Sequence, residues 1–314
     1  MTINKDLIKS FVKTTERGAY GASMFRGKND KIGADQAAVD EMRNELNKIS
    51  MKGRIVIGEG EMDEAPMLYI NEEVGTNNGE ELDIAVDPLE GTNFTAKNLP
   101  NALSVLAVTR KGDLLHAPDM YMEKIVVGPN LPKNIVNLDY DIKKNIRLLA
   151  EAKNLKSNEL TACILKRPRH DLIIKNLTEL GVKIKYINDG DVLGAILVAQ
   201  PNSDIDIYLG IGGAPEGVLA AAALKCFNCQ MQTRLIFYNE DEKNKAFSLG
   251  ISNLDRKYNI DDMIKGDVIF CATGVTDGEL VNGIIDSGDF FISETLVLHK
   301  STSTNTIIKN KIKK

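Results

Sequence analysis

The stretch from residue 82 to 94, L-D-I-A-V-D-P-L-E-G-T-N-F, constrains the fold more than any other part of the chain. Its first five residues are mostly apolar and β-branched, which favours a strand. Because Pro88 cannot donate to a ladder, we expect this strand to end at Asp87. The E-G-T that follows predicts a tight loop with exposed backbone, holding two acids and a hydroxyl near one strand end. An Asp-Pro turn with solvated acids is the alternative for this segment taken alone.

Composition places the chain among globular proteins that bind small molecules. With 314 residues, 43% hydrophobic and 26% charged, it can bury a large core, most simply as two domains. A formal net charge of -5 gives no basic field to hold nucleic acid, so an anionic ligand needs locally placed Lys and Arg. No long uncharged apolar run is present, at the amino terminus or elsewhere, so we expect a cytoplasmic protein without a membrane partner.

Cysteine and histidine are expected to play structural roles. Four cysteines are too few for a disulfide framework in a chain of this size, so we expect reduced thiols. Cys226 and Cys229 form C-x-x-C, but no second pair or histidine cluster completes a tetrahedral zinc site. His116 and His170 are interpreted as ordinary structural or surface residues.

Two further acids lie at the ends of predicted elements in the first half. A helix is expected over residues 5–20, and a second apolar stripe of helical period begins at Ala34. Asp35 then lies in the first turn, on or beside the buried stripe, where it is either a helix cap or a ligand. A brief strand over residues 54–57 runs into G-E-G-E, whose glycines place Glu59 where the backbone bends sharply.

The strand pattern predicts a mixed α/β fold in two layered domains. Strands over residues 102–109 and 124–127 are expected to be antiparallel neighbours, which makes the sheet of the first domain mixed. We place that domain at residues 1–135 and the second at 136–314, with a helix over 140–154 leading into it.

Alternating strands and helices from Thr161 onward predict a smaller sheet with covering helices in the second domain. Further strands are expected over residues 267–272 and 290–298. The tail K-N-K-I-K-K, residues 309–314, is expected to be frayed.

Acids thus recur at five separated element ends. Two like charges 4 Å apart repel by about 4 kcal/mol at an effective dielectric constant of 20, so a convergent group would bind cations. Oxygen ligands without histidine or cysteine favour Mg²⁺ or Mn²⁺. The acids concerned are Asp35, Glu59, Asp87 with Glu90, Asp189 with Asp191, and Glu216.

Two segments of the second domain are suited to phosphate. Arg167 and Arg169 follow a strand end in K-R-P-R-H-D, where guanidinium groups can bind an anion. The G-I-G-G-A-P-E-G loop precedes an alanine-rich helix, with Pro215 suited to its start and Glu216 in its first turn. The loop lacks the spacing of a dinucleotide fingerprint.

Several of these blocks closely resemble those of the bacterial class II fructose-1,6-bisphosphatases, in the same order and over most of the chain. D-P-L-E-G-T is also similar to the D-P-x-D-G-[ST] block of the wider lithium-sensitive phosphatase superfamily. The resemblance implies a two-domain sugar-phosphatase fold. The other blocks are I-V-I-G-E-G-E-M-D-E-A-P-M-L-Y-I, A-P-D-M-Y-M-E-K-I-V-V-G, R-P-R-H-D, N-D-G-D-V and Y-L-G-I-G-G-A-P-E-G-V.

The resemblance also implies the site residues. Cation ligands would be Asp35, Glu59, Asp87, Glu90 and Glu216, with the Leu89 carbonyl as a further ligand. Substrate contacts would come from Glu90, Gly91, Thr92, Tyr121, Arg167, Arg169, Asp189, Gly190, Asp191 and Gly213. The family usually has lysine where this chain has Arg167, and the two side chains are not equivalent at a phosphate.

The implied reaction is hydrolysis of the 1-phosphate of fructose 1,6-bisphosphate in gluconeogenesis, with Mn²⁺ or Mg²⁺, by a homo-oligomer. Thr92, Glu59 and Asp35 would be the catalytic residues, with Thr92 acting on the water through a carboxylate, in the first instance Glu59. A broader sugar bisphosphatase that also takes sedoheptulose 1,7-bisphosphate, an inositol-phosphate phosphatase, and a non-catalytic sugar-phosphate-binding module are the alternatives.

Overall fold

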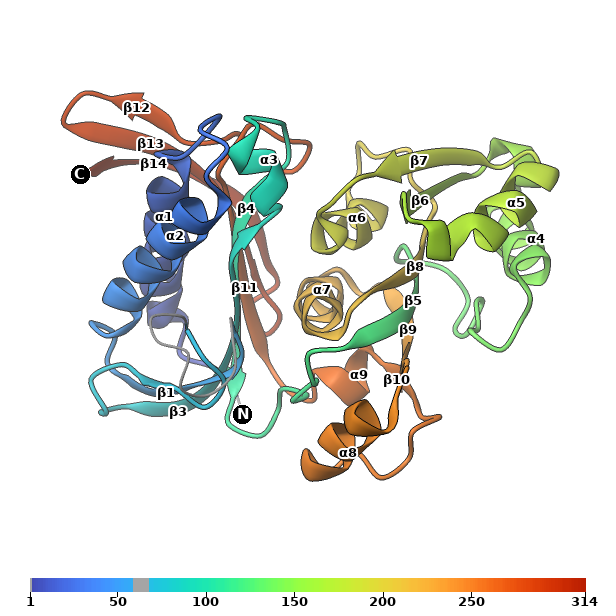
Figure 1. Ribbon diagram of the computed structural model, residues 1–314, viewed down its shortest axis with the longest axis horizontal. Coiled ribbons are helices and arrows are strands. Elements are labelled where there is room, and N and C mark those ends of the chain that lie inside the picture. Colours follow the sequence, from blue (N-terminus) through green and yellow to red (C-terminus); the bar gives the residue numbers. More distant parts are fainter. Residues whose placement is uncertain (1, 59–67) are drawn as a thin grey trace. The chain divides into compact units, whose positions relative to one another are not determined.

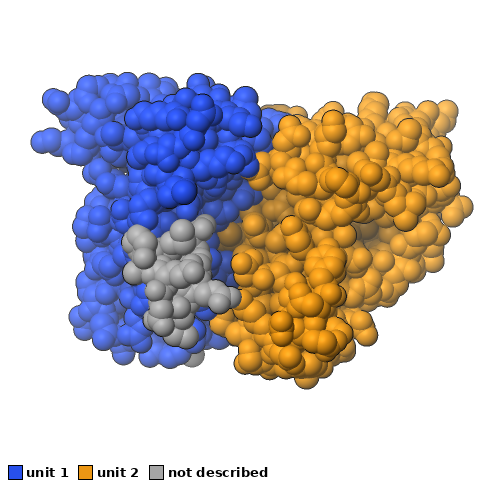
Figure 2. Space-filling view, viewed as in Figure 1, with its two compact units in different colours: residues 1–115, 264–314 blue, residues 116–263 orange. Residues whose placement is uncertain are grey.

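The computed structural model describes residues 2–58 and 68–314. Contacts divide the chain into two compact units, unit 1 (Met1–Leu115 with Ile264–Lys314) and unit 2 (His116–Met263), coloured separately in Figure 2. This division differs from the predicted boundary at residue 135, because residues 121–127 pair with strands of unit 2. The chain also returns to the first unit after residue 263. The metal-binding and substrate-binding roles assigned to the two predicted domains stay predictions.

Unit 1 is built on an eight-stranded mixed sheet. Its order is β12-β13-β11-β4-β3-β1-β2, with β14 paired to β13. Only β1 and β3 are parallel to each other; the other pairs are antiparallel. The strands are β1 (Met51–Ile57), β2 (Glu73–Val74), β3 (Glu80–Glu90), β4 (Leu103–Arg110), β11 (Val268–Gly274), β12 (Ile285–Ser287), β13 (Phe290–His299) and β14 (Thr304–Lys313).

Helices α1 (Ile8–Ser23) and α2 (Lys31–Leu46) lie side by side on one face of this sheet (Figure 1). The short η1 (Lys5–Leu7) precedes α1, and α3 (Thr92–Ala96) follows β3. The apolar stripes of both helices meet the sheet in one core, in which Phe11 and Met42 are fully buried. The two helices predicted from their apolar period are therefore confirmed.

Strand β3 corrects the prediction that proline ends the strand at Asp87. It continues to Glu90 through a register shift against β4, where two residues of β3 lie opposite one of β4. Pairing of β3 with β1 stops at Ala85, so the missing N–H of Pro88 removes no bond on that side. A bulge of this kind bends the strand and redirects its side chains.

Unit 2 has a six-stranded mixed sheet of order β10-β9-β5-β8-β6-β7. Only β6 is parallel to its partners, β7 and β8. The strands are β5 (Tyr121–Val127), β6 (Thr161–Leu165), β7 (Lys183–Ile187), β8 (Ile207–Gly213), β9 (Gln230–Leu235) and β10 (Lys257–Asn259). The prediction that residues 124–127 pair with residues 102–109 was wrong, because β5 and β4 belong to different sheets.

Helices cover this sheet, as predicted for the segment after Thr161, and they lie on both of its faces. Figure 1 shows α4 and α5 on one face and α6 and α7 on the other. No helix within the described residues is long and apolar enough to cross a membrane. The helices are α4 (Ile142–Lys153), η2 (Ser157–Glu159), η3 (Pro168–His170), α5 (Asp171–Glu179), α6 (Asp191–Ile196), η4 (Leu197–Ala199), α7 (Ala214–Phe227), α8 (Glu240–Ser248) and α9 (Ile260–Met263).

The C-terminal tail is a strand rather than a frayed end. All ten residues of β14 pair with β13, from Phe290↔Lys313 to His299↔Thr304. Alternate side chains of β14 turn inward, where Ile308 and Ile312 pack against the core of unit 1. The lysines between these isoleucines make the segment read as a charged tail, so the alternation of a strand was not recognised in the sequence.

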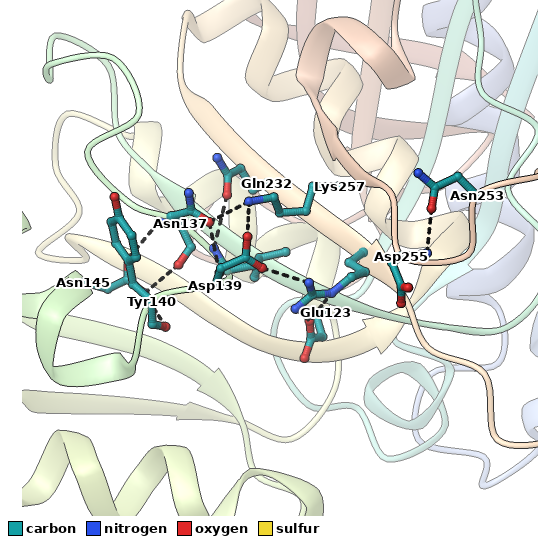
Figure 3. Close-up of polar contacts among 11 residues, drawn as sticks. Glu123, Asn137, Asp139, Tyr140, Asn145, Gln232, Asn253, Asp255 and Lys257 are labelled. Carbon is teal, nitrogen blue, oxygen red and sulfur yellow. Dashed lines mark hydrogen bonds and ion pairs between the residues drawn. The ribbon is translucent and has the colours of Figure 1, made fainter.

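A polar network ties the segment before α4 to three strands of unit 2 (Figure 3). Asp139 accepts hydrogen bonds from Lys257 on β10 and from Arg234 on β9. Arg234 in turn donates to Glu123 on β5, with Nη2 3.0 Å from Oε2. The backbone N–H of Leu138 donates to Gln232 on β9. This long connection is therefore held to the sheet along its length.

Candidate functional site

The loop after the bulge of β3 is held by its own side chains. The backbone N–H of Leu89 donates to Oδ1 of Asp87, 3.1 Å away, and the Thr92 hydroxyl donates to the Leu89 carbonyl at 3.2 Å. Gly91 has φ +84°, a left-handed conformation that favours glycine. Glu90 is buried, with 6% of its surface exposed. The loop thus brings the acids and hydroxyl of the predicted site close together at the start of α3.

Asp35 lies in α2 but does not cap it. Asp30 is the N-cap, since its Oδ1 accepts from the N–H of Gly33 at 2.8 Å. Asp35, four residues into the helix, has no hydrogen-bond or ion-pair partner among the described residues. Burial raises the pKa of its carboxyl, because removal from water disfavours the charged form. Helix α2 packs against β3 and α3, which carry the other unit 1 candidates.

Glu59 lies outside the described residues. Its neighbour Gly58 follows β1, whose last residue Ile57 pairs with Ala85 of the parallel strand β3. A Cβ at Gly58 would come within 2.1 Å of the Leu68 carbonyl oxygen, so the backbone passes too closely for any other residue. The end of β1 therefore lies beside the part of β3 that comes two residues before Asp87.

In unit 2, Glu216 lies in the first turn of α7, as predicted. Gly213 is the N-cap residue of this helix. A Cβ on Gly213 would be 1.9 Å from Oε2 of Glu216, so the carboxylate folds back over Gly213 and a larger residue there would displace it. Burial and the charge of Asp191 raise the pKa of Glu216, and the positive charge of Lys124 acts in the opposite direction. Such a carboxyl gains from a nearby cation.

The loop between β7 and α6 positions the other acids of unit 2. Gly190, with φ +77°, is the N-cap residue of α6, and its N–H donates to Oδ1 of Asp189. Asp191 is 7% exposed and accepts from Nζ of Lys124 on β5 at 2.6 Å. Lys124 was not predicted as a site residue. Its only signal was its place inside the apolar run K-I-V-V, where a charge needs a partner.

Arg169 is oriented by backbone and by aromatic rings. Its Nε and Nη2 both donate to the Ile211 carbonyl, at 3.1 and 2.8 Å, and its guanidinium lies 4.7 Å from the centroid of the Tyr121 ring. Tyr238, which the sequence did not single out, packs edge-on against Tyr121 with centroids 5.9 Å apart. Among the described residues, the Arg167 side chain donates a hydrogen bond to the neighbouring Lys166 carbonyl, with Nη1 3.0 Å from the oxygen.

His170 is part of the scaffold beneath Arg169. Its Nδ1 donates to the Leu165 carbonyl at 2.6 Å, and its Nε2 accepts from the N–H of Ile211 at 2.7 Å. Burial lowers the pKa of this imidazole, which favours the neutral ring that both bonds require. These contacts agree with its predicted structural role.

The cysteines are free thiols, and two of them lie near the end of α7. Burial raises the pKa of Cys229 to about 12, so its thiol stays protonated at neutral pH. This agrees with the expectation of reduced, unreactive cysteines.

The predicted site residues that the structure describes fall into two local groups, one in each unit. Unit 1 holds Asp35, Asp87, Glu90, Gly91 and Thr92; unit 2 holds Tyr121, Arg167, Arg169, Asp189, Gly190, Asp191, Gly213 and Glu216. Over residues 2–58 and 68–314, no three or more Asp, Glu, His or Cys side chains are arranged to hold a metal ion. The full ligand set, which includes Glu59, remains a prediction.

Comparison with known proteins places the chain in a family. A family model described as bacterial fructose-1,6-bisphosphatase, glpX-encoded, matches residues 5–312. Fructose-1,6-bisphosphatase class 2 of Haemophilus influenzae is 43% identical over 96% of this chain and 94% of that protein. Fructose-1,6-bisphosphatase 1 class 2 of Escherichia coli K12 is also 43% identical, with the same coverage.

Among solved structures, one described as an inositol monophosphatase-fructose 1,6 bisphosphatase is 12% identical and aligns with a TM-score of 0.37. It covers 66% of this chain and 75% of that chain, a likeness too low to bear on the fold. The family model and the relatives at 43% identity are sufficient by themselves to assign the family. The chain belongs to the glpX-encoded bacterial fructose-1,6-bisphosphatase family.

Proposed function

We propose that this chain hydrolyses the 1-phosphate of fructose 1,6-bisphosphate, giving fructose 6-phosphate and phosphate, in gluconeogenesis. The observation that carries this proposal is the 43% sequence identity with class 2 fructose-1,6-bisphosphatases over nearly the whole chain. The local geometry of both units supports it, since each holds acids, glycines or arginines suited to phosphoryl transfer at element ends.

The proposed cation ligands are Asp35, Glu59, Asp87, Glu90 and Glu216, and the proposed ions are Mn²⁺ or Mg²⁺. All the donors are carboxylate oxygens, which these hard ions prefer. Burial raises the pKa of both Asp35 and Glu216, so a nearby positive charge would stabilise their ionised forms. When bound, such ions neutralise charge on the transferring phosphoryl group and acidify the attacking water.

Thr92 is proposed to position the attacking water, with Glu59 and Asp35. Because the Thr92 hydroxyl gives its proton to the Leu89 carbonyl, its oxygen lone pairs remain available to accept a hydrogen bond from water. A carboxylate, in the first instance Glu59, would take the proton of that water. Gly91 and Glu90 would lie against the transferred phosphate.

The remaining residues are proposed to hold the sugar and its distal phosphate. The two bonds from Arg169 to Ile211 and its stacking on Tyr121 fix the guanidinium plane, which leaves its other N–H groups to bind a phosphate. Arg167 would add a second guanidinium. Sugar hydroxyls would be held by Asp189, Gly190 and Asp191, with Gly213 close by.

Phosphate release from the purified chain, stripped of metal with a chelator, tests the proposal. Activity on fructose 1,6-bisphosphate should be absent without metal and return with Mn²⁺ or Mg²⁺. Asp87→Asn should lower kcat at least about 100-fold, whereas Glu81→Gln, on the exposed part of the same strand, should leave it unchanged.

A substrate panel separates the alternatives. kcat/KM for fructose 1,6-bisphosphate should exceed that for sedoheptulose 1,7-bisphosphate and for inositol monophosphate. Higher values for either of these would assign the chain to a different reaction. Metal-independent binding of sugar phosphates without turnover would make it a binding module.

A cytoplasmic location and a homo-oligomeric state are part of the proposal. The free thiols of the described chain suit a reducing compartment. Cell fractionation tests the location. Light scattering on the eluting peak of a sizing column tests the assembly, and a mass near 34.5 kDa would show a monomer instead.

A further inference from the structure

Lys124 is a buried charge in the middle of β5. It is 2% exposed, and its Nζ lies 2.6 Å from Oδ2 of Asp191, itself 7% exposed. Lysine is almost never buried this fully unless it is paired. Lys124 pairs with Asp191 of α6 and passes close to Gly217 of α7, so its side chain lies on the face of the sheet that these two helices cover. The residues beside it on the strand, Glu123 and Ile125, point to the opposite face.

The surrounding backbone is shaped for this lysine. A Cβ on Gly217 in α7 would come within 3.1 Å of Cε of Lys124. A Cβ on Gly212 in β8 would be 1.9 Å from Oδ2 of Asp191 and 3.1 Å from Nζ of Lys124. Both glycines therefore provide space that the paired side chains use. Any larger residue at Gly212 would push the Asp191 carboxylate from its place.

The pair also lies beside Glu216. The Asp191 carboxylate and the Lys124 ammonium lie against Gly212, and the Glu216 carboxylate lies against the next residue, Gly213, so the three charged groups are neighbours. At such a separation the charges of Asp191 and Lys124 act on Glu216 in opposite directions. Without Lys124, the repulsion between the buried Asp191 and Glu216 carboxylates would have no positive charge to offset it.

We propose that Lys124 is a positioning residue of the phosphatase site: its ammonium group fixes the Asp191 carboxylate for the sugar hydroxyls and offsets the charge between Asp191 and Glu216. This inference rests on the proposed function, because it gives Asp191 and Glu216 the roles proposed above. Lys124 acts through Asp191 and does not itself touch the substrate.

Lys124→Met keeps the length of the stem and removes the charge, and it should affect substrate binding first. KM for fructose 1,6-bisphosphate and the calorimetric Kd for fructose 6-phosphate should both rise about 10- to 100-fold, the usual range for residues that orient a site. Lys124→Arg should recover part of this loss, since it restores the positive charge.

Lys225→Met is the matched control. Lys225 lies near the other end of α7 and its Nζ is 2.8 Å from Oδ1 of Asp261, so the variant also breaks an ion pair of unit 2. It should leave KM and Kd within twofold of the wild type. If Lys225→Met weakened substrate binding as much as Lys124→Met, the effect of Lys124→Met would reflect a general loss of stability, and the proposal would be overturned.

The double variant Lys124→Met/Asp191→Asn separates positioning from folding. If Lys124 acts through Asp191, the double variant should bind no more weakly than Asp191→Asn alone, and removing both charges should let it fold even where Lys124→Met does not. Additive losses would contradict the proposal, as would unchanged KM and Kd in folded Lys124→Met. A wild-type chain with no activity on any sugar bisphosphate would instead refute the proposed function, and this inference with it.

Discussion

Asp35 is a carboxylate placed in a helix where it caps nothing and pairs with nothing among the described residues. Replacing it with Asn removes a charge whose burial is unfavourable, so the metal-free protein should keep its thermal stability at pH 7. Activity should nevertheless fall at least about 100-fold, because the variant lacks a carboxylate that we propose as a cation ligand. Melting curves and phosphate release on the same preparation check both statements.

Asp30→Ala is the matched variant, five residues away on the same helix. It removes the N-cap bond to Gly33 and should lower the free energy of unfolding by about 1 kcal/mol while kcat stays within twofold. If Asp35→Asn destabilised the protein and kept its activity, the roles given to the two aspartates would be reversed.

Glu16 predicts a pH dependence of stability. Its buried carboxyl accepts from the Ser293 hydroxyl and the Asn310 amide, each at 2.8 Å, yet burial raises its pKa. Its contribution to stability is therefore fully present below the pKa of the unfolded chain, about 4.3, and is lost as pH rises through the higher folded pKa.

Glu16→Gln should thus have a higher melting temperature than the wild type at pH 8. The difference in melting temperature should become smaller as the pH falls toward 4.5. Melting temperatures across this range provide the measurement. Glu73→Gln, at an exposed position of β2, should follow the wild type at every pH. A difference that widens toward acid pH would mean that the folded protein stabilises the ionised carboxyl instead.

At the scale of elements, the pairing of β14 with β13 depends on the alternation of inward and outward side chains along β14. Ile308 packs against the core of unit 1, whereas its neighbour Ile307 is 53% exposed. Ile308→Ala should lower the free energy of unfolding by about 1–2 kcal/mol, below the loss for a fully buried isoleucine, because the side chain is partly exposed. Ile307→Ala should have little effect. Urea unfolding of the two variants tests the register, since equal losses would mean that the tail does not pair as described.

At the scale of the molecule, residues 116–263 form a continuous segment with their own sheet and core. Expressed alone, this segment should fold, with mixed α/β circular dichroism and a cooperative melt. Residues 1–115 alone should not, because β4 would lose its partner β11 and the sheet its last four strands. The isolated unit 2 should show no phosphatase activity. A non-cooperative melt of residues 116–263 would show that the fold of unit 2 needs unit 1.

Local signals were sufficient for most helices and for the loops that carry the acids. The apolar period located α1 and α2, and glycine with proline located the start of α7 and the loop around Gly91, because such preferences act within a few residues. The family blocks supplied the candidate ligands in the same way, as short runs of neighbouring residues.

Long-range pairing was decided only by the tertiary structure. The sequence alone indicated that β4 and β5 are extended, but not that β4 joins β11 or that β5 lies in the other sheet. For the tail it indicated a frayed end, where the structure has β14 completing the first sheet. Lys124 and Asp191, 67 residues apart, became partners for the same reason. Strand partners and buried ion pairs depend on which segments bury their apolar faces together, and this is a property of the whole chain that no short window contains.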